Sequence, residues 1–417
     1  MTTSMVGGAE QYLRDLLEGV DYKRFAIYLY TSDQPEFIAY LELDRHPLIN
    51  HRILDLRDEG SFRTTSARTM QQSAPASWRR LVSSIPCARP IWIGLLRIVR
   101  YAVWLSNVKS VERAVRYDQL DILHIVNGGY PGAVSAQAAA IGGRNAGIRS
   151  CIMTVSSHPF RRRFPRSLER WIDQRVFASL SKVITPAPSN GAALIEYRGL
   201  PLDKLVHIWL GVEIPDPSEP VRLEVRAALG LTQMCSVVGT VCNFLPGKGI
   251  ATLMRSLAIL NTSGNDVYGL FVGDGPYRVT AEALADELGL RKKLIFTGHS
   301  SRVNEMLQAM DIFALPSDTE GLSYVILEAM SQSRPVVATS VGGIRDSTVD
   351  GETAILVPPR DPVALANALS VLLADPGLAD SMGRAGRARF LRYFALADML
   401  ERHQYLYSEL IATSGKR

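Results

Sequence analysis

The stretch Asp311-Ile-Phe-Ala-Leu-Pro-Ser-Asp-Thr-Glu-Gly-Leu-Ser-Tyr-Val-Ile-Leu-Glu-Ala-Met-Ser-Gln-Ser-Arg-Pro-Val-Val-Ala-Thr339 decides the fold of this 417-residue chain. Ile312–Leu315 is a short apolar run that a Pro-Ser pair ends, which is typical of a buried parallel strand. Apolar residues then recur at helical spacing, so a helix is predicted over 321–332. A strand, a turn and a helix in this order predict an open α/β sheet, whose ligands bind at the carboxyl edge of the strands.

Two glutamates stand at this edge. Glu320 occupies the strand-to-helix turn, and Glu328 follows eight positions later, about 12 Å along a helix that rises 1.5 Å per residue. The amides of Gly321 and Leu322 at the predicted helix start are free to face an anion such as a diphosphate, which the helix dipole favours. Two carboxylates at this separation can meet both ends of one ligand. The alternative of two solvated surface glutamates is disfavoured by the strand, turn and helix around them.

Short motifs of the same kind recur through the carboxyl half of the chain. They are Gly239-Thr240-Val241 followed by Lys248-Gly249, Gly273-Asp274-Gly275-Pro276, Pro335–Thr339, Val341-Gly342-Gly343 and Asp350-Gly351. Together with the Glu-x7-Glu segment they make residues 235–412 resemble the donor half of a retaining glycosyltransferase of family 4. In the amino half, Gly7-Gly8-Ala9-Glu10 and the predicted strand Asp121–His124 are similar to the acceptor half of that family.

The resemblance implies an α/β protein of the GT-B fold, in which two Rossmann-like, doubly wound domains face a cleft. It also implies transfer of a sugar from a UDP-, GDP- or ADP-sugar to a saccharide or a lipid-linked acceptor, in polysaccharide or glycolipid biosynthesis. No metal and no other cofactor is expected to be essential.

The resemblance assigns catalytic roles to three residues. Lys248 would stabilise the charge that develops on the leaving diphosphate. Glu320 would bind hydroxyls of the donor sugar, and His158, which follows the predicted strand 150–155, would lie at the reaction centre. A lone histidine is also often structural, and a lone lysine in a loop is often solvated surface. The residues that the resemblance assigns to donor binding are Glu328, which would hold the ribose, and Gly321, Leu322, Asn243, Gly273, Gly275, Gly7 and Gly8.

The sequence departs from the family at two of these places. Asn243 stands where the family has an arginine, and an amide offers hydrogen bonds but no charge. Phosphate binding is therefore expected to be weaker here, or to rely on another cation. Only Met1–Val6 precedes Gly7, whereas the family places the central strand of its first sheet there. We expect that strand to be missing, or the native start to lie upstream of Met1.

Charge is distributed unevenly along the chain. The net charge is +5, but residues 1–210 hold 27 Lys and Arg against 18 Asp and Glu. Such a surplus indicates an anionic partner, either a membrane surface, a lipid-linked phosphate or a nucleic acid, although no motif supports the last. The run Arg161-Arg162-Arg163 with Arg166 is either an acceptor pocket or a solvated face. The Trp- and Arg-rich stretch 92–105 fits a membrane-surface helix or a helix that covers a sheet.

A chain of this length predicts two or three domains. We expect an acceptor domain over 1–212, a nucleotide-sugar domain over 213–394 and a helix over 395–417 that crosses back to the first domain. The four cysteines lack metal or redox spacing, and no signal peptide is recognisable, so we expect a cytoplasmic protein, either free or peripheral at the inner face of the membrane. The stretch 90–105 is too short and too charged to span a bilayer.

Two other functions compete with a transferase. A sugar-nucleotide epimerase of the same fold would need additional acid and base carboxylates, which the Glu-x7-Glu block does not supply. A non-catalytic subunit that kept the nucleotide-sugar site would be compatible with Asn243 and with the short amino terminus.

Overall fold

The computed structural model describes residues 8–32, 34–54, 56, 88–132, 134–162, 166–213 and 215–414. The expectations for Gly7, for Arg163 and for residues before Gly7 lie outside the described residues, as does the predicted loop 57–77. The chain divides into two compact units. The amino-terminal unit comprises Met1–Thr185, Gly191–Val206 and Gln404–Arg417, and the carboxyl-terminal unit comprises Pro186–Asn190 and His207–His403. The division near residue 207 precedes the boundary expected at 212.

The carboxyl-terminal unit is built on a parallel sheet of six strands in the order β12-β11-β10-β7-β8-β9. Its strands are β7 (Ser236–Val241), β8 (Val267–Val272), β9 (Leu294–Gly298), β10 (Ile312–Leu315), β11 (Val336–Thr339) and β12 (Ala354–Val357). The four inner strands β7, β8, β10 and β11 are buried along nearly their whole length, whereas the edge strands β9 and β12 are partly buried. The predicted strand Ile312–Leu315 is β10 and lies between β7 and β11, near the middle of the sheet.

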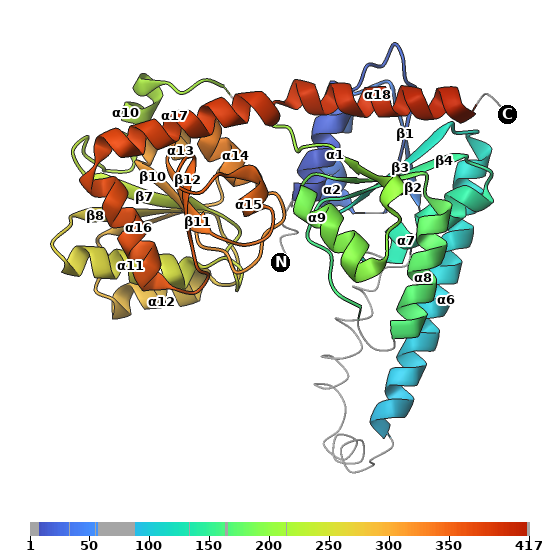
Figure 1. Ribbon diagram of the computed structural model, residues 1–417, viewed down its shortest axis with the longest axis horizontal. Helices are drawn as coiled ribbons and strands as arrows, with labels where there is room; N and C mark the ends of the chain where they lie inside the picture. Colours follow the sequence, from blue (N-terminus) through green and yellow to red (C-terminus); the bar gives the residue numbers. More distant parts are fainter. Residues whose placement is uncertain are drawn as a thin grey trace. The chain divides into compact units, whose positions relative to one another are not determined.

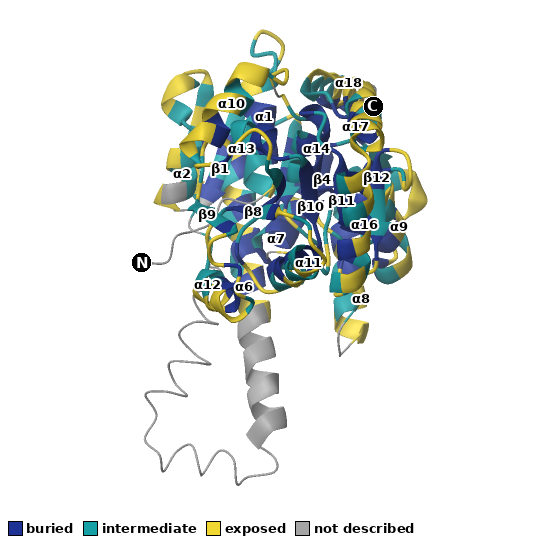
Figure 2. Cartoon of the chain, turned by 90° about the vertical axis from the view of Figure 1, so that its left-hand side faces the viewer, coloured by how far each residue is buried: buried dark blue, intermediate teal, exposed yellow. Residues whose placement is uncertain are grey.

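Helices cover both faces of this sheet (Figure 1). One layer contains α11 (Ile250–Thr262), α12 (Arg278–Glu287) and α16 (Pro362–Ala374), and the other contains α10 (Glu219–Ala228), α13 (Val303–Ala309), α14 (Tyr324–Ser331) and α17 (Pro376–Tyr393). Figure 2 shows buried strands inside and exposed residues on the outer sides of the helices. Burial on both faces explains why the strands read as continuous apolar runs rather than as alternating patterns.

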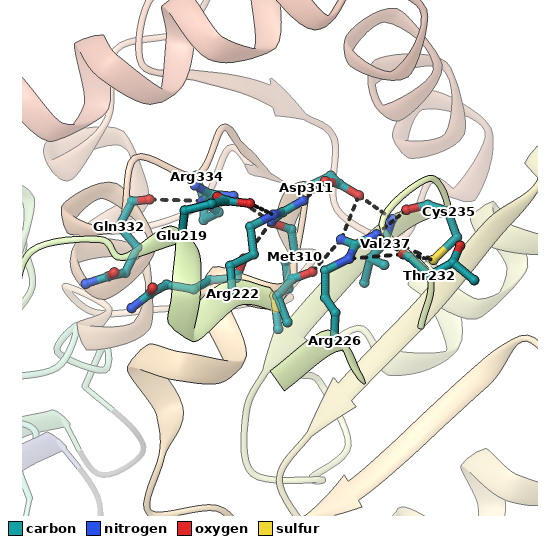
Figure 3. Close-up of polar contacts among 12 residues, drawn as sticks. Glu219, Arg222, Arg226, Thr232, Cys235, Val237, Met310, Asp311, Gln332 and Arg334 are labelled. Atoms are coloured by element: carbon teal, nitrogen blue, oxygen red, sulfur yellow. Dashed lines mark hydrogen bonds and ion pairs between the residues drawn. The ribbon is translucent and has the colours of Figure 1, made fainter. Parts of the chain in front are cut away.

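Asp311 ties the amino ends of β7 and β10 together (Figure 3). Its carboxylate accepts hydrogen bonds from the Val237 amide at 2.7 Å and from Arg222 at 2.5 Å, and Arg226 lies 3.4 Å away. Burial lowers the pKa of the neighbouring Arg334 to about 10, which still leaves that guanidinium charged near neutral pH. This cluster lies at the edge of the sheet opposite to the Glu320 turn, so we interpret it as a structural anchor.

In the amino-terminal unit the described strands form two sheets, β1-β2 and β3-β4-β5-β6, in which the pairs β1–β2, β3–β4 and β4–β5 are parallel. The strands are β1 (Ile27–Ser32), β2 (Ile49–Leu54), β3 (Ile122–Asn127), β4 (Ser150–Val155), β5 (Lys182–Thr185) and β6 (Leu205–His207). The helices are α1 (Gly8–Gly19), α2 (Pro35–Tyr40), α6 (Ala88–Tyr117), α7 (Val134–Asn145), α8 (Arg166–Ser179) and α9 (Pro188–Ala193), the last of which starts in the other unit. A five-residue π-helical turn, Leu194–Arg198, continues α9.

The last helix, α18 (Leu396–Ser414), contributes its first residues to the carboxyl-terminal unit and its residues from Gln404 onward to the amino-terminal unit. Within the latter, the Tyr407 hydroxyl is hydrogen-bonded to His124 Nδ1 at 2.7 Å, and His124 Nε2 to the Thr154 hydroxyl at 2.8 Å. His124 is therefore engaged in packing. Within the described part of the chain, no single helix has both the length and the apolar character needed to cross a membrane.

Buried His403 makes the stability of the fold depend on pH. Burial lowers the pKa of this imidazole from 6.5 to about 4, and Nδ1 lies 2.7 Å from the Met399 carbonyl oxygen. Between these two pKa values the unfolded chain binds a proton that the folded chain does not. The stability that is present above pH 6.5 is therefore lost as the pH falls toward 4.

We expect this histidine to account for about 2 kcal/mol of the loss in unfolding free energy between pH 7.5 and pH 5, at about 1.36 kcal/mol per pKa unit. Urea midpoints at the two pH values should therefore differ less in His403→Gln than in the wild type. His299→Gln, at an exposed position, is the matched control. An equal pH dependence in wild type and His403→Gln would contradict the assignment.

Candidate functional site

Three loops meet at the carboxyl edge of the six-stranded sheet. They follow β7, β10 and β11, which are neighbours in the sheet, and they carry Lys248, Glu320 and the pair Gly342-Gly343. Open α/β sheets bind ligands at this edge. The topology therefore brings together residues that lie nearly a hundred positions apart in the chain.

Lys248 and Glu320 form an ion pair. Lys248 Nζ lies 2.7 Å from Glu320 Oε1, and the Ser317 hydroxyl donates to the same oxygen at 2.8 Å. The Glu320 side chain is 12% exposed and the Lys248 side chain 29% exposed. An ammonium has three donors, so Lys248 retains donors for a further acceptor. The sequence predicted both residues for this site but not their direct contact.

Two glycines on either side of Lys248 let its loop lie against the β10 loop. Gly247 and Gly249 have φ of +92° and +72°, in the left-handed region that favours glycine. A Cβ on Gly249 would stand 1.9 Å from the Pro316 carbonyl oxygen. The Asp318 amide donates to the Gly247 carbonyl at 2.7 Å. These contacts fix the backbone from which Lys248 reaches Glu320.

The loop after β11 packs on the backbone of the Glu320 turn from the other side. A Cβ on Gly342, whose φ is +45°, would stand 1.9 Å from the Glu320 carbonyl oxygen. The Gly343 amide donates to that same carbonyl at 3.4 Å, and a Cβ on Gly343 would stand 2.5 Å from the Gly321 carbonyl oxygen. Only glycines allow this approach, which accounts for the Gly-Gly motif.

The helix after Glu320 starts later than the sequence predicted. α14 begins at Tyr324, because Ser323 is extended, with φ −90° and ψ 117°. Gly321 and Leu322 therefore precede the helix, and the expectation that they form its first turn was wrong. Leu322 is buried. Glu328 lies within α14, half-buried and about 6 Å along its axis from Tyr324.

The loops after β7 and β8 lie against each other and bring Asn243 beside the Gly-Asp-Gly motif. The Phe244 amide donates to the Asp274 carbonyl at 2.8 Å, and a Cβ on Gly273 would stand 1.9 Å from the Cys242 carbonyl oxygen. Gly273 and Gly275 both have positive φ. Burial raises the pKa of the Cys242 thiol to about 12, so this cysteine is no thiolate nucleophile.

In the amino-terminal unit, Gly8 begins α1, and His158 follows β4 as predicted. The His158 ring packs edge-on against Tyr197, with 5.9 Å between the ring centroids. Its Nδ1 is enclosed and has no hydrogen-bond partner among the described residues. An enclosed ring nitrogen without a partner is a candidate for contact with a ligand.

Arg161, Arg162 and Arg166 line one pocket of about 560 Å³ in this unit. Arg161 and Arg166 are exposed, so an acceptor pocket and a solvated face both stay predictions for these arginines. The sequence did not point to the other residues that line this pocket, which include Arg170, Glu196 and Tyr197. The four-residue spacing of Arg166 and Arg170, which places both on one face of α8, was the available signal.

Comparison with known proteins agrees with this architecture. Residues 221–389 match the family described as "Glycosyl transferases group 1". One similar protein is the GDP-mannose-dependent alpha-(1-6)-phosphatidylinositol monomannoside mannosyltransferase of Mycolicibacterium smegmatis, 36% identical over 200 residues, which cover 45% of this chain and 52% of that protein. The chain spans about half the length of the curated relatives it matches.

Solved structures match over nearly the whole chain. A glycosyltransferase from Rickettsia africae has a TM-score of 0.75 at 18% identity, covering 98% of this chain and 96% of that one. Anabaena Alr3699/HepE, in complex with UDP and glucose, has a TM-score of 0.73 at 20% identity and covers 98% of both chains. At these identities the likeness concerns the fold, and the predicted GT-B class with Rossmann-like sheets is confirmed.

Proposed function

We propose that the protein is a retaining glycosyltransferase, because residues 221–389 match the glycosyl transferases group 1 family. It moves a sugar from a nucleotide-diphosphate sugar to a hydroxyl of a saccharide or lipid-linked acceptor, in polysaccharide or glycolipid biosynthesis. The names of its relatives support a nucleotide-linked donor, since one depends on GDP-mannose and a structural neighbour holds UDP and glucose.

The observation that carries this proposal is the Lys248–Glu320 pair at the sheet edge. Glycosyl transfer passes through an oxocarbenium-like transition state while the leaving diphosphate gains charge. A fixed ammonium near that diphosphate stabilises the transition state more than the ground state. Lys248 and Ser317 both donate to Glu320 Oε1, and in this proposal Glu320 binds hydroxyls of the donor sugar.

The remaining steps of the proposal follow from retention of configuration. The leaving phosphate, bound by Lys248, accepts the proton of the acceptor hydroxyl on the same face of the sugar. Glu328 binds the ribose, and His158 lies at the reaction centre. No metal or other cofactor is required, because the ammonium supplies the positive charge that the leaving group needs.

We further propose a cytoplasmic location with reversible attachment to the inner face of the membrane. The positive surplus over residues 1–210 supports this, since each basic residue near an anionic surface contributes roughly 1 kcal/mol. Tyr101 and Trp171, whose rings lie 6.4 Å apart, are each more than a third exposed and add apolar surface, whereas Trp104 is buried in the core of this unit.

The test is incubation of the purified protein with a panel of UDP-, GDP- and ADP-sugars, with and without a chelator. Slow donor hydrolysis, observed by proton NMR so that the first-formed anomer is identified, is expected for one donor. Binding without turnover would favour a non-catalytic subunit, conversion to an epimeric nucleotide sugar would favour an epimerase, and an inverted first product would exclude retention.

Glu320→Gln and Glu328→Gln are each expected to lower the rate of transfer at least tenfold without unfolding the protein. A hydrogen bond from a charged group contributes about 1.5–3 kcal/mol, and about 1.4 kcal/mol corresponds to tenfold in rate. Glu287→Gln, at an exposed position at the end of α12, is the matched control. Near-normal rates in both site variants would remove the two carboxylates from the proposed donor site.

A further inference from the structure

The basic pocket of the amino-terminal unit lies between the start of α8 and the π-helical turn Leu194–Arg198. Arg166 is the first residue of α8, and Arg170 follows one turn later. Positive side chains in the first turn oppose the helix dipole, and like charges four residues apart repel each other. Each effect destabilises the helix. The acidic residue of the same turn, Glu169, is engaged with Arg198 2.9 Å away, so it does not pair with either arginine.

The carboxylates around this pocket do not supply enough negative charge. Asp173 lies 2.8 Å from Arg162 Nε and 2.8 Å from an Arg198 nitrogen, and Glu169 lies 2.9 Å from Arg198. Glu196 lies 3.2 Å from Arg161 in an exposed pair. The residues that line the pocket or contact its lining include five arginines and three carboxylates: Arg161, Arg162, Arg166, Arg170 and Arg198, and Glu169, Asp173 and Glu196. Arg166 and Arg170 form no ion pair with any described residue. Two positive charges remain uncompensated.

Arg162 is the most buried arginine of the pocket, and its hydrogen bonds fix its position. Arg162 is 21% exposed, donates from Nε to buried Asp173, and donates again to the Arg198 carbonyl. Arg198 itself is 2% exposed and lies against Asp173 and Glu169. A guanidinium that is fixed in this way presents its remaining donors in a defined direction, which suits bidentate recognition of a phosphate.

Tyr197 connects the pocket to His158. The Arg161 guanidinium lies over the Tyr197 ring, 4.2 Å from its centroid, and the His158 ring meets the same tyrosine edge-on. Tyr197 belongs to a π-helical turn, a feature that often marks functional sites. The cationic wall and the histidine expected at the reaction centre are therefore separated by a single aromatic side chain.

We propose that this pocket binds a phosphate group of the acceptor, a phosphomonoester or phosphodiester, and so presents the acceptor next to His158; the proposal rests on the transferase function above. A phosphate carries the one or two negative charges that the arginines lack. The volume of about 560 Å³ exceeds an inorganic phosphate and suits a phosphorylated sugar or a lipid headgroup. Exposed Phe160 and Leu168, which adjoin pocket residues in sequence, offer apolar surface beside it.

The experiment compares the full-length wild type with Arg166→Gln/Arg170→Gln and with Arg175→Gln. Arg175, on the same helix, stacks on Trp171 and lines no part of the pocket, so it is the matched control. The probes are glycerol 3-phosphate, measured by calorimetry, and phosphatidylcholine vesicles with and without phosphatidylinositol, measured by co-sedimentation. Urea midpoints check that each variant is folded.

We expect the double variant to bind glycerol 3-phosphate at least tenfold more weakly than the wild type, and Arg175→Gln to bind it equally well. Binding of phosphatidylinositol vesicles alone, lost in the double variant, would assign the phosphate to a lipid headgroup. Equal affinity in wild type and double variant, or no binding of either probe by the wild type, would overturn the proposal. Donor hydrolysis by the wild type needs no acceptor, so the transferase function can stand while this inference fails.

Discussion

Replacement of Lys248 by methionine is expected to lower the rate of sugar transfer by two to three orders of magnitude. Methionine keeps an unbranched chain of similar length but removes the ammonium that lies 2.7 Å from Glu320. Loss of one preorganised group that stabilises developing charge typically costs about 10²–10³ in kcat. Because that charge develops in the transition state, kcat should fall more than the affinity for the donor.

The measurement is steady-state transfer, or donor hydrolysis if no acceptor is known, for the wild type, Lys248→Met and the control Lys292→Met. Lys292 is exposed and lies in the turn before β9. The control should keep the wild-type rate. A Lys248→Met rate within threefold of the wild type, with the fold intact, would show that another cation neutralises the leaving group.

Replacement of Asp173 by asparagine is expected to destabilise the amino-terminal unit by about 3–5 kcal/mol, the usual cost of removing one partner from a buried ion pair. Asp173 is 1% exposed and accepts from Arg162, Arg198 and the Tyr130 hydroxyl. Burial raises the pKa of Asp173, and its ion pairs act in the opposite direction. The variant would leave Arg198, which is 2% exposed, with Glu169 as its remaining carboxylate partner among the described residues.

Urea unfolding followed by tryptophan fluorescence is suitable, because Trp104 and Trp171 belong to this unit. Asp203→Asn, at an exposed position, is the matched control and should leave the midpoint unchanged. An Asp173→Asn midpoint equal to that of the wild type would mean that the buried network contributes nothing to stability, and that Arg162 is held in the pocket by other contacts.

The strands of the carboxyl-terminal unit could be predicted because burial on both faces leaves an unbroken apolar run, as in Phe313 and its neighbours. Strand β2 could not be predicted, because His51 and Arg52 within it are polar and its residues alternate between exposed and half-buried only over part of its length. The start of α14 was misplaced because apolar spacing begins at Leu322, whereas helical geometry begins only after the extended Ser323. Spacing reports which face a residue belongs to, and it does not report the dihedral angles at a helix end.

The contacts of the site were less predictable than its members. Lys248 and Glu320 were each recognisable in their own motif, but their contact depends on the adjacency of β7 and β10, which no local pattern encodes. Tyr197 was missed for a similar reason, since a lone tyrosine in a π-helical turn has no periodic signal. Its role becomes visible only where the turn returns beside His158.

The close packing of the three loops limits how the carboxyl-terminal unit can be re-engineered. Gly249 allows no Cβ beside the Pro316 carbonyl, and Gly342 allows none beside the Glu320 carbonyl. The backbone of each loop therefore packs directly against the backbone of its neighbour. A single loop transplanted from a relative would lack the neighbouring loop that its own backbone packs against. Chimeras that exchange donor preference should carry residues 242–343 as one block, with the intervening strands, rather than the Glu320 turn alone.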